Sequence, residues 1–168
     1  DNLNGLIFYG GYPELYAEEL SENQSMIQEI KNAITYGMPY LAECGGFMYL
    51  HEFMEDMKGN THSMLGILKG TAYKLSKLAR FGYIELKSNK TSVLGNEDLF
   101  CRGHEFHYFD STSNGTDFVA RKPLTNRSWE CIHANENGVA GFPHMYYYSN
   151  PQMIVDFLKN CERTDEGA

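Results

Sequence analysis

Residues 39–50 read PYLAECGGFMYL, and this stretch decides the fold. An apolar segment too short for a helix runs into Cys44, and helix spacing resumes over residues 47–54. Small residues stand two positions before and two positions after the cysteine, as Ala42 and Gly46. This spacing is typical of the strand–turn–helix elbow that carries the nucleophile of hydrolases. We therefore predict a buried strand that ends at Cys44 and a helix that follows it.

The predicted elbow suits nucleophilic chemistry. A helix N-terminus carries partial positive charge and free N–H groups, so it favours the reactive thiolate of Cys44. The N–H of Gly45 could donate to an oxyanion that forms when the sulfur attacks a carbonyl. An earlier strand over residues 5–9 ends at Gly10-Gly11, where Gly11 or Tyr12 could supply a second donor. The alternative is a buried cysteine that only packs beside a turn.

The rest of the chain indicates an α/β fold. Residues 23–36 carry an apolar stripe at helix spacing and stop at Gly37, and residues 153–160 form a second amphipathic pattern. Short apolar and aromatic runs separated by turn residues predict strands at 81–86, 106–109, 118–120, 128–133 and 139–142. We predict one domain over residues 1–168, a layered sheet with flanking helices and some antiparallel additions.

Composition excludes several classes of protein. The net charge of -8, with only 14 scattered Lys and Arg residues, argues against a nucleic-acid partner. No apolar run approaches the roughly 20 residues of a membrane-spanning helix, so no membrane partner is expected. The absence of a recognisable signal peptide favours the cytoplasm, where all four cysteines would be free thiols. The chain opens without Met on an apolar run, which we interpret as a fragment of a longer protein.

A thiolate nucleophile requires an imidazole, and six histidines compete for this role. His51 would lie about 10 Å along the helix from Cys44 at 1.5 Å per residue, which is too far. His62 is expected in a polar loop and His133 at a strand end. His144 directly follows the strand predicted over residues 139–142, where a ligand crevice would lie. We predict that His144 is the base.

Cys101, His104 and His107 form a C-x2-H-x2-H pattern that could bind a metal. The preceding Gly103 and the aromatic run that follows favour a strand, on which His104 and His107 point to opposite faces. We therefore predict no metal site, and we expect His104, Glu105 or His107 to contact the substrate from a pocket wall.

Four motifs occur in the order of a known family: GGYPEL from Gly10, AECGGFMYL from Ala42, GHEFHY from Gly103 and SNP from Ser149. Together they resemble the C-terminal glutaminase domain of cobyrinic acid a,c-diamide synthases, a class I, cobalamin-synthesis-type glutamine amidotransferase domain with a flavodoxin-like fold. The resemblance spans about residues 3–158. It implies that Cys44 forms a glutamyl thioester, that His144 moves the protons, and that ammonia passes to an N-terminal ATP-dependent domain.

In that family the N-terminal domain holds ATP and Mg²⁺ and amidates the a and c carboxylates of a corrin-type macrocycle. No cofactor is expected on residues 1–168. The chain departs from the family pattern because Tyr146 stands where a second histidine, or in many class I enzymes a glutamate, follows the catalytic histidine. The resemblance thus implies a Cys–His dyad. Compared with the usual domain, we interpret this chain as lacking the first strand and helix. Alternatives are a Ni-sirohydrochlorin a,c-diamide synthase and a non-catalytic docking module.

Overall fold

The computed structural model describes residues 3–125 and 127–163, which form three sheets and a small set of helices. The first sheet has the strand order β1-β2-β12-β11. Its strands are β1 (Leu6–Phe8), β2 (Tyr40–Glu43), β12 (Gly138–Gly141) and β11 (His133–Ala134). β2 pairs in parallel with both β1 and β12, and β11 pairs antiparallel with β12. All residues of β2 and β12 are buried, so the continuous apolar runs in the sequence correspond to central strands.

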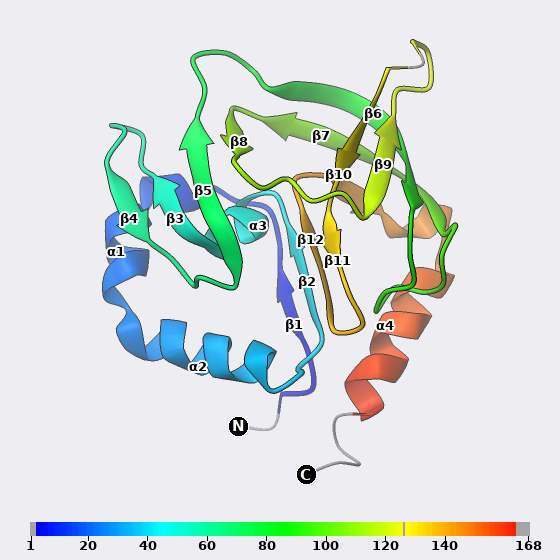
Figure 1. Ribbon diagram of the computed structural model, residues 1–168, viewed down its shortest axis with the longest axis horizontal. Helices are drawn as coiled ribbons and strands as arrows, with labels where there is room; N and C mark the ends of the chain where they lie inside the picture. Colours follow the sequence, from blue (N-terminus) through cyan, green and yellow to red (C-terminus); the bar gives the residue numbers. More distant parts are fainter. Residues whose placement is uncertain (1–2, 126, 164–168) are drawn as a thin grey trace.

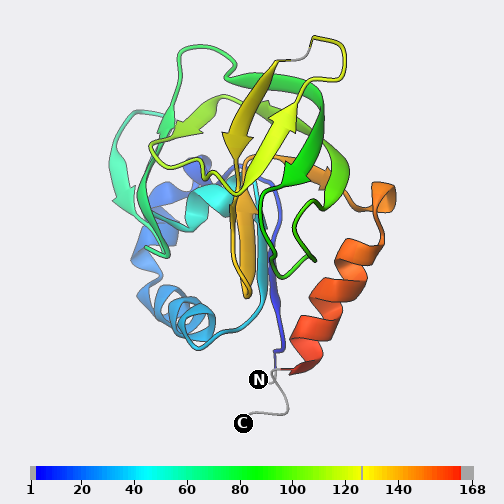
Figure 2. The same ribbon diagram turned by 45° about the vertical axis from the view of Figure 1, so that its right-hand side comes forward.

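Helices lie on both sides of this first sheet. α2 (Gln24–Thr35) lies on one side and α4 (Gln152–Arg163) on the other, as Figures 1 and 2 show. Asn23 caps α2 by accepting a hydrogen bond from the N–H of Met26, and Gly37 follows the helix with a φ of 92°. The predicted layered α/β architecture is therefore confirmed. The start of β1 and the end of α4 lie at the same end of the molecule, away from the tips of β1 and β2 (Figure 1).

The second sheet is antiparallel and lies above the first in Figure 1, with the order β10-β9-β6-β7-β13. Its strands are β10 (Ser128–Cys131), β9 (Phe118–Arg121), β6 (Arg80–Ser88), β7 (Phe100–His107) and β13 (His144–Tyr146). β7 alternates strictly between exposed and buried residues, so one face of this sheet packs inward. The strands predicted at 81–86, 118–120 and 139–142 are confirmed, and β6 extends beyond its predicted segment. The strands predicted at 106–109 and 128–133 are wrong in extent, because at each the chain passes from one sheet to another: from β7 to β8 (Phe109–Ser111), and from β10 to β11.

The third sheet has the order β4-β3-β5-β8 and contains most of what the sequence did not predict. Its strands are β3 (His51–Glu55), β4 (Thr61–Ser63), β5 (Leu68–Lys74) and β8 (Phe109–Ser111). The helix predicted over residues 47–54 is wrong in its second half, because α3 (Gly45–Tyr49) ends early and β3 begins at His51. β3 gains partners on both sides, β4 and β5, which local helix spacing cannot anticipate. A short helix, α1 (Ala17–Glu22), was also not predicted.

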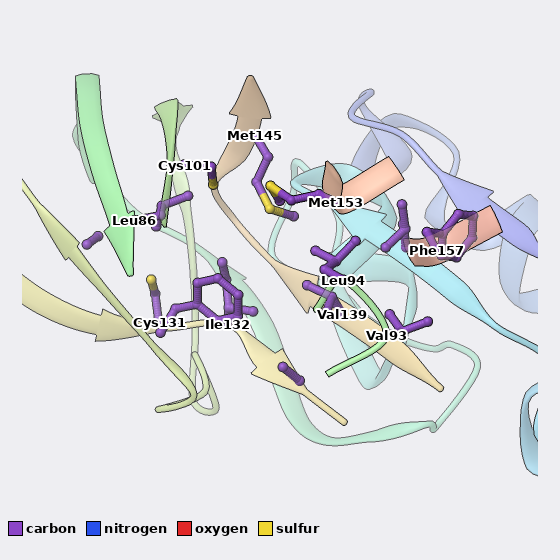
Figure 3. Packing of buried hydrophobic residues seen from close by; sticks show 14 of the residues in the cluster. Leu86, Val93, Leu94, Cys101, Cys131, Ile132, Val139, Met145, Met153 and Phe157 are labelled. Atoms are coloured by element: carbon purple, nitrogen blue, oxygen red, sulfur yellow. The ribbon is translucent and has the colours of Figure 1, made fainter. Parts of the chain in front are cut away.

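One core cluster joins the first two sheets to α4. Figure 3 shows Met145 of β13 beside Met153 of α4, with Leu86 and Cys101 from the upper sheet nearby. Val139 of β12 belongs to the same cluster. β13 is therefore held between two layers by its middle residue, which fixes the position of the residue on either side. Within the described ranges, no helix has both the length and the apolar character that crossing a membrane requires.

Candidate active site

The predicted elbow is present at the end of β2. Cys44 has φ 50° and ψ −108°, a conformation that non-glycine residues rarely adopt. Such backbone strain costs about 1–3 kcal/mol and persists only where the surroundings impose it. Here the N–H of Cys44 donates to the carbonyl of Gly141 at 2.9 Å, and the N–H of Met48 donates to the carbonyl of Cys44 at 3.0 Å. A Cβ on Gly46 would overlap the carbonyl of Phe8, so the elbow requires the small residue that the sequence places there.

The glycine pair that ends β1 lies beside the elbow. If Gly45 carried a Cβ, that atom would lie 2.8 Å from the backbone oxygen and 2.9 Å from the backbone nitrogen of Gly11. The two predicted sources of oxyanion donors are therefore neighbours in space. Both Gly11 and Tyr12 line a pocket of about 630 Å³ that also contains Cys44 and His144. The other residues around this pocket are Tyr9, Gly10, Glu14, Met48, His104, Phe106, His107, Tyr108 and Phe109.

His144 is the histidine that the structure brings to the elbow. It begins β13 directly after the loop that leaves β12, and His144 lines the same pocket as Cys44. A Cβ on Gly10 would lie 2.5 Å from Cε1 of His144, so the imidazole packs directly on the backbone of the glycine pair. The ring of His104 stacks on it, with centroids 4.9 Å apart and an interplanar angle of 14°. Three separate segments thus define the position of this ring.

Glu43 is a site residue that sequence reasoning missed. It precedes Cys44, is only 5% exposed, and its Oε2 lies 3.6 Å from Nδ1 of His144. Interaction with the Cys44 side chain first, and then with the Glu43 carboxylate, raises the pKa of His144 to about 10. The sequence did contain a signal, because a carboxylate in a fully buried strand requires a partner. The family-based expectation considered only position 146, where Tyr146 is 58% exposed.

The three residues predicted to contact substrate divide between the two faces of β7. His104 is on the exposed face and in the pocket, and burial first, then the charge of His144, lowers its pKa. Glu105 is 1% exposed and is not among the residues that line the pocket. His107 lines the pocket, but its ring is stacked on Phe142 with centroids 4.1 Å apart, and the residue is only 5% exposed. Only His104 presents an exposed ring to the site.

Cys101 is buried on the same face of β7 as His107 and opposite to His104. The C-x2-H-x2-H pattern therefore does not bring its three side chains together. Burial raises the pKa of the Cys101 thiol to about 12, so this thiol is unreactive in comparison with a cysteine at an open pocket.

The other histidines have structural partners. His51 begins β3 instead of lying on a helix, and its ring nitrogens contact the carbonyl of Phe47 at 2.9 Å and the hydroxyl of Ser111 at 2.6 Å. His62 lies on β4, where its Nε2 is 3.3 Å from Asp56. His133 lies on β11 and contacts the carbonyl of Ser113 at 2.9 Å. These contacts occupy the rings of His51, His62 and His133, so none of the three can act as the base predicted for His144. The exclusion of His51 by its distance along a helix is wrong, because His51 lies on a strand.

Comparison with known protein families identifies the family to which the chain belongs. The model of the CobB/CobQ-like glutamine amidotransferase domain matches residues 1–151 of the chain. The chain belongs to this family. The chain is therefore a glutamine amidotransferase domain, as the resemblance of its four sequence motifs implied.

Relatives of this amidotransferase domain carry a more specific name. The cobyrinate a,c-diamide synthase of Caldanaerobacter subterraneus subsp. tengcongensis is 38% identical over 96% of this chain, and that of Clostridium acetobutylicum is 36% identical over 97%. The chain spans 36% of the length of each of these relatives.

Solved structures show the fold of the amidotransferase domain independently. A glutamine amidotransferase crystal structure matches with a TM-score of 0.63 at 16% identity, covering 95% of this chain and 79% of that one. The structure of PurLQS from Thermotoga maritima matches with a TM-score of 0.62 at 16% identity, covering 92% and 78%. Because the identity is low, these likenesses establish the fold alone.

Proposed function

We propose that this domain hydrolyses glutamine through a covalent thioester on Cys44. The observation that carries the proposal is a cysteine on a strained turn, at the wall of a pocket of about 630 Å³ that the imidazole of His144 also lines. An imidazole beside a thiol supports a thiolate–imidazolium pair, which is the usual form of an activated cysteine nucleophile.

The proposed reaction has two halves. The Cys44 thiolate attacks the side-chain carbonyl carbon of glutamine, and the oxygen becomes an oxyanion that the N–H groups of Gly45 and of Gly11 or Tyr12 can stabilise. His144 then donates a proton to the amide nitrogen, the C–N bond breaks, and ammonia leaves. In the second half, a water molecule gives a proton to His144 and attacks the thioester. The C–S bond breaks, the product acid loses its proton to solvent and leaves as glutamate, and the Cys44 thiolate and protonated His144 are restored.

The destination of the ammonia is also part of the proposal. By analogy with the relatives named cobyrinate a,c-diamide synthase, we propose that ammonia passes to an N-terminal synthetase domain that uses ATP and Mg²⁺. That domain would amidate the a and c carboxylates of cobyrinic acid, as part of cobalamin biosynthesis in the cytoplasm. The identity of 38% to a cobyrinate enzyme supports this macrocycle over a Ni-sirohydrochlorin.

A diazo-ketone analogue of glutamine tests the nucleophile directly. We expect one covalent adduct, located on Cys44 by peptide mass spectrometry, and loss of ammonia release from glutamine in proportion to labelling. An adduct on Cys101 or Cys131 would refute the assignment. Absence of both adduct and ammonia in the full-length protein would instead support a non-catalytic docking module.

A further inference from the structure

Glu43 ends β2 directly before the nucleophile, and its carboxylate is almost completely withdrawn from water. A buried carboxylate is destabilising unless donors surround it. Oε1 of Glu43 accepts a hydrogen bond from the hydroxyl of Tyr147 at 2.6 Å and from the N–H of Met145 at 3.3 Å. Oε2 is directed to Nδ1 of His144 at 3.6 Å. The carboxylate is therefore held by the same segment that carries the histidine.

The donors of Glu43 stay in place at ordinary pH. Burial first, then the charge of Glu43, raises the pKa of Tyr147, so its hydroxyl remains protonated and continues to donate. Met145 is a core residue held against α4, which fixes its N–H (Figure 3). One oxygen is thus fixed by two donors, which leaves the other oxygen directed at the imidazole.

A carboxylate at Nδ1 has a defined effect on an imidazole. It favours the N–H at Nδ1, leaves Nε2 as the second ring nitrogen for the thiol, and stabilises the imidazolium that forms during catalysis. The contact of 3.6 Å is long for a direct hydrogen bond, as catalytic contacts often are without substrate. Over residues 3–125 and 127–163, Glu43 is the carboxylate that forms an ion pair with His144.

We infer that Glu43, clamped by Tyr147, is a positioning residue that orients His144 toward Cys44 and completes a Cys–His–Glu arrangement. This inference rests on the proposed function of Cys44 and His144. The acid comes from the residue before the nucleophile and not from the second residue after the histidine. The domain would therefore retain a third member even though Tyr146 occupies the usual position.

The test compares Glu43→Gln, Glu43→Asp and Tyr147→Phe with two matched controls, Glu29→Gln and Tyr36→Phe, which are exposed on or beside α2. Steady-state ammonia release gives kcat and KM, and NMR of proteins containing [13Cε1]-histidine follows the titration of His144. Thermal unfolding confirms that each variant is folded.

We expect Glu43→Gln to lower kcat by about 10- to 100-fold while KM changes by less than about threefold, as loss of an orienting partner does. The titration midpoint of His144 should move to lower pH, because the carboxylate no longer stabilises the imidazolium. Glu43→Asp keeps the charge on a shorter side chain, so its kcat should lie between those of Glu43→Gln and the wild type. Tyr147→Phe should lower kcat and the titration midpoint of His144 less than Glu43→Gln does. The controls should match the wild type.

An unchanged kcat together with an unchanged titration of His144 in folded Glu43→Gln would overturn the inference and leave Glu43 a purely structural residue. If Glu43→Gln does not fold, Tyr147→Phe decides by the same two readouts, because it removes only a hydroxyl. The titration needs no turnover, so it reports on Glu43 even in a protein that releases no ammonia. Failure of the proposed function would appear separately, as a wild type without adduct on Cys44.

Discussion

Two acid–histidine pairs in this domain have the same separation and different surroundings. Glu43 and His144 lie 3.6 Å apart, and so do Glu105 and His107. The side chain of His144 is 26% exposed and lines the pocket with Cys44, whereas that of His107 is 3% exposed and stacked on Phe142. The second pair even has a cysteine nearby, because Cys131 and Glu105 line the same small cavity.

The difference between the pairs shows what turns an acid and an imidazole into a reactive site. Burial raises the pKa of Cys131, and the charge of Glu105 adds to this, so the thiol is not available as a thiolate. Nδ1 of His107 is already committed to the carbonyl of Phe109 at 2.6 Å. The first pair has a half-buried thiol at the wall of a pocket of about 630 Å³. The Glu43–His144 pair differs from the Glu105–His107 pair in its access to the pocket and in having a ring nitrogen available to a thiol. The distance between the acid and the imidazole does not distinguish the pairs.

Substitution of the two cysteines gives the largest expected contrast. Cys44→Ala should abolish glutamine hydrolysis, a loss of at least about 10⁴-fold, because among the described residues Cys44 is the only cysteine that lines the pocket. Cys131→Ala should retain wild-type kcat in the folded protein, since its sulfur only packs in the core. Ammonia release measured with purified, reduced protein checks both. Equal losses in the two variants would break the comparison.

Substitutions of the two histidines should give the next largest effects on kcat. His144→Asn should lower kcat by about 10³- to 10⁴-fold, because the thiol loses its base. His107→Asn should leave kcat per folded molecule within about threefold and instead lower the free energy of unfolding by about 1–3 kcal/mol, since a buried hydrogen bond and ring stack are disturbed. Urea unfolding and ammonia assays on the same samples separate these effects. Strong loss of activity in folded His107→Asn would contradict the structural role given to that pair.

A methyl group added beside the His144 ring should have an intermediate effect. In Gly10→Ala the new Cβ would lie 2.5 Å from Cε1 of His144, so the ring must move and kcat should fall by about 10- to 100-fold. Gly5→Ala is the matched control, because its Cβ would meet Sγ of Cys161 at 2.6 Å, away from the pocket. The control should lose stability but keep its kcat. Wild-type kcat in Gly10→Ala would show that the packing of the ring is unimportant.

The smallest expected effect is on stability as a function of pH. The pKa of His144 is raised from 6.5 to about 10, so the folded state binds this proton more tightly than the unfolded state. The resulting stabilisation is complete below about 6.5 and is lost as the pH rises through about 10. The free energy of unfolding from urea titrations should therefore decline over this window, and less steeply in His144→Asn. Identical slopes in the two proteins would contradict the assignment.

The part of the fold that the sequence predicted is the part whose signals are local. The central strand before Cys44, the helix over residues 24–35 and most strands of the upper sheet follow from apolar runs, glycines and periodicity. The third sheet was missed because β3 takes its conformation from partners distant in the sequence, β5 among them. Helix spacing after Cys44 was a true signal for one turn and a misleading one beyond Leu50.

The candidate site shows the same division. Cys44 and His144 could be selected from the residues around them, and glycines on either side of the elbow pointed to its geometry. Glu43 could not be connected to His144 without knowing that β13 passes the tip of β2. The opposite fates of His104 and Glu105 were predictable from strand alternation, but which face of β7 meets the pocket depends on the packing of whole sheets.

The positive φ of Cys44 has a consequence beyond the site itself. A turn that costs about 1–3 kcal/mol is maintained by the sheet around it, through the hydrogen bond to Gly141 and the packing of Gly46 on Phe8. When that sheet frays, the turn relaxes and the sulfur loses its fixed place beside His144. Reactivity is thus coupled to the integrity of the domain. A misfolded copy would lose the ability to consume glutamine together with its native structure.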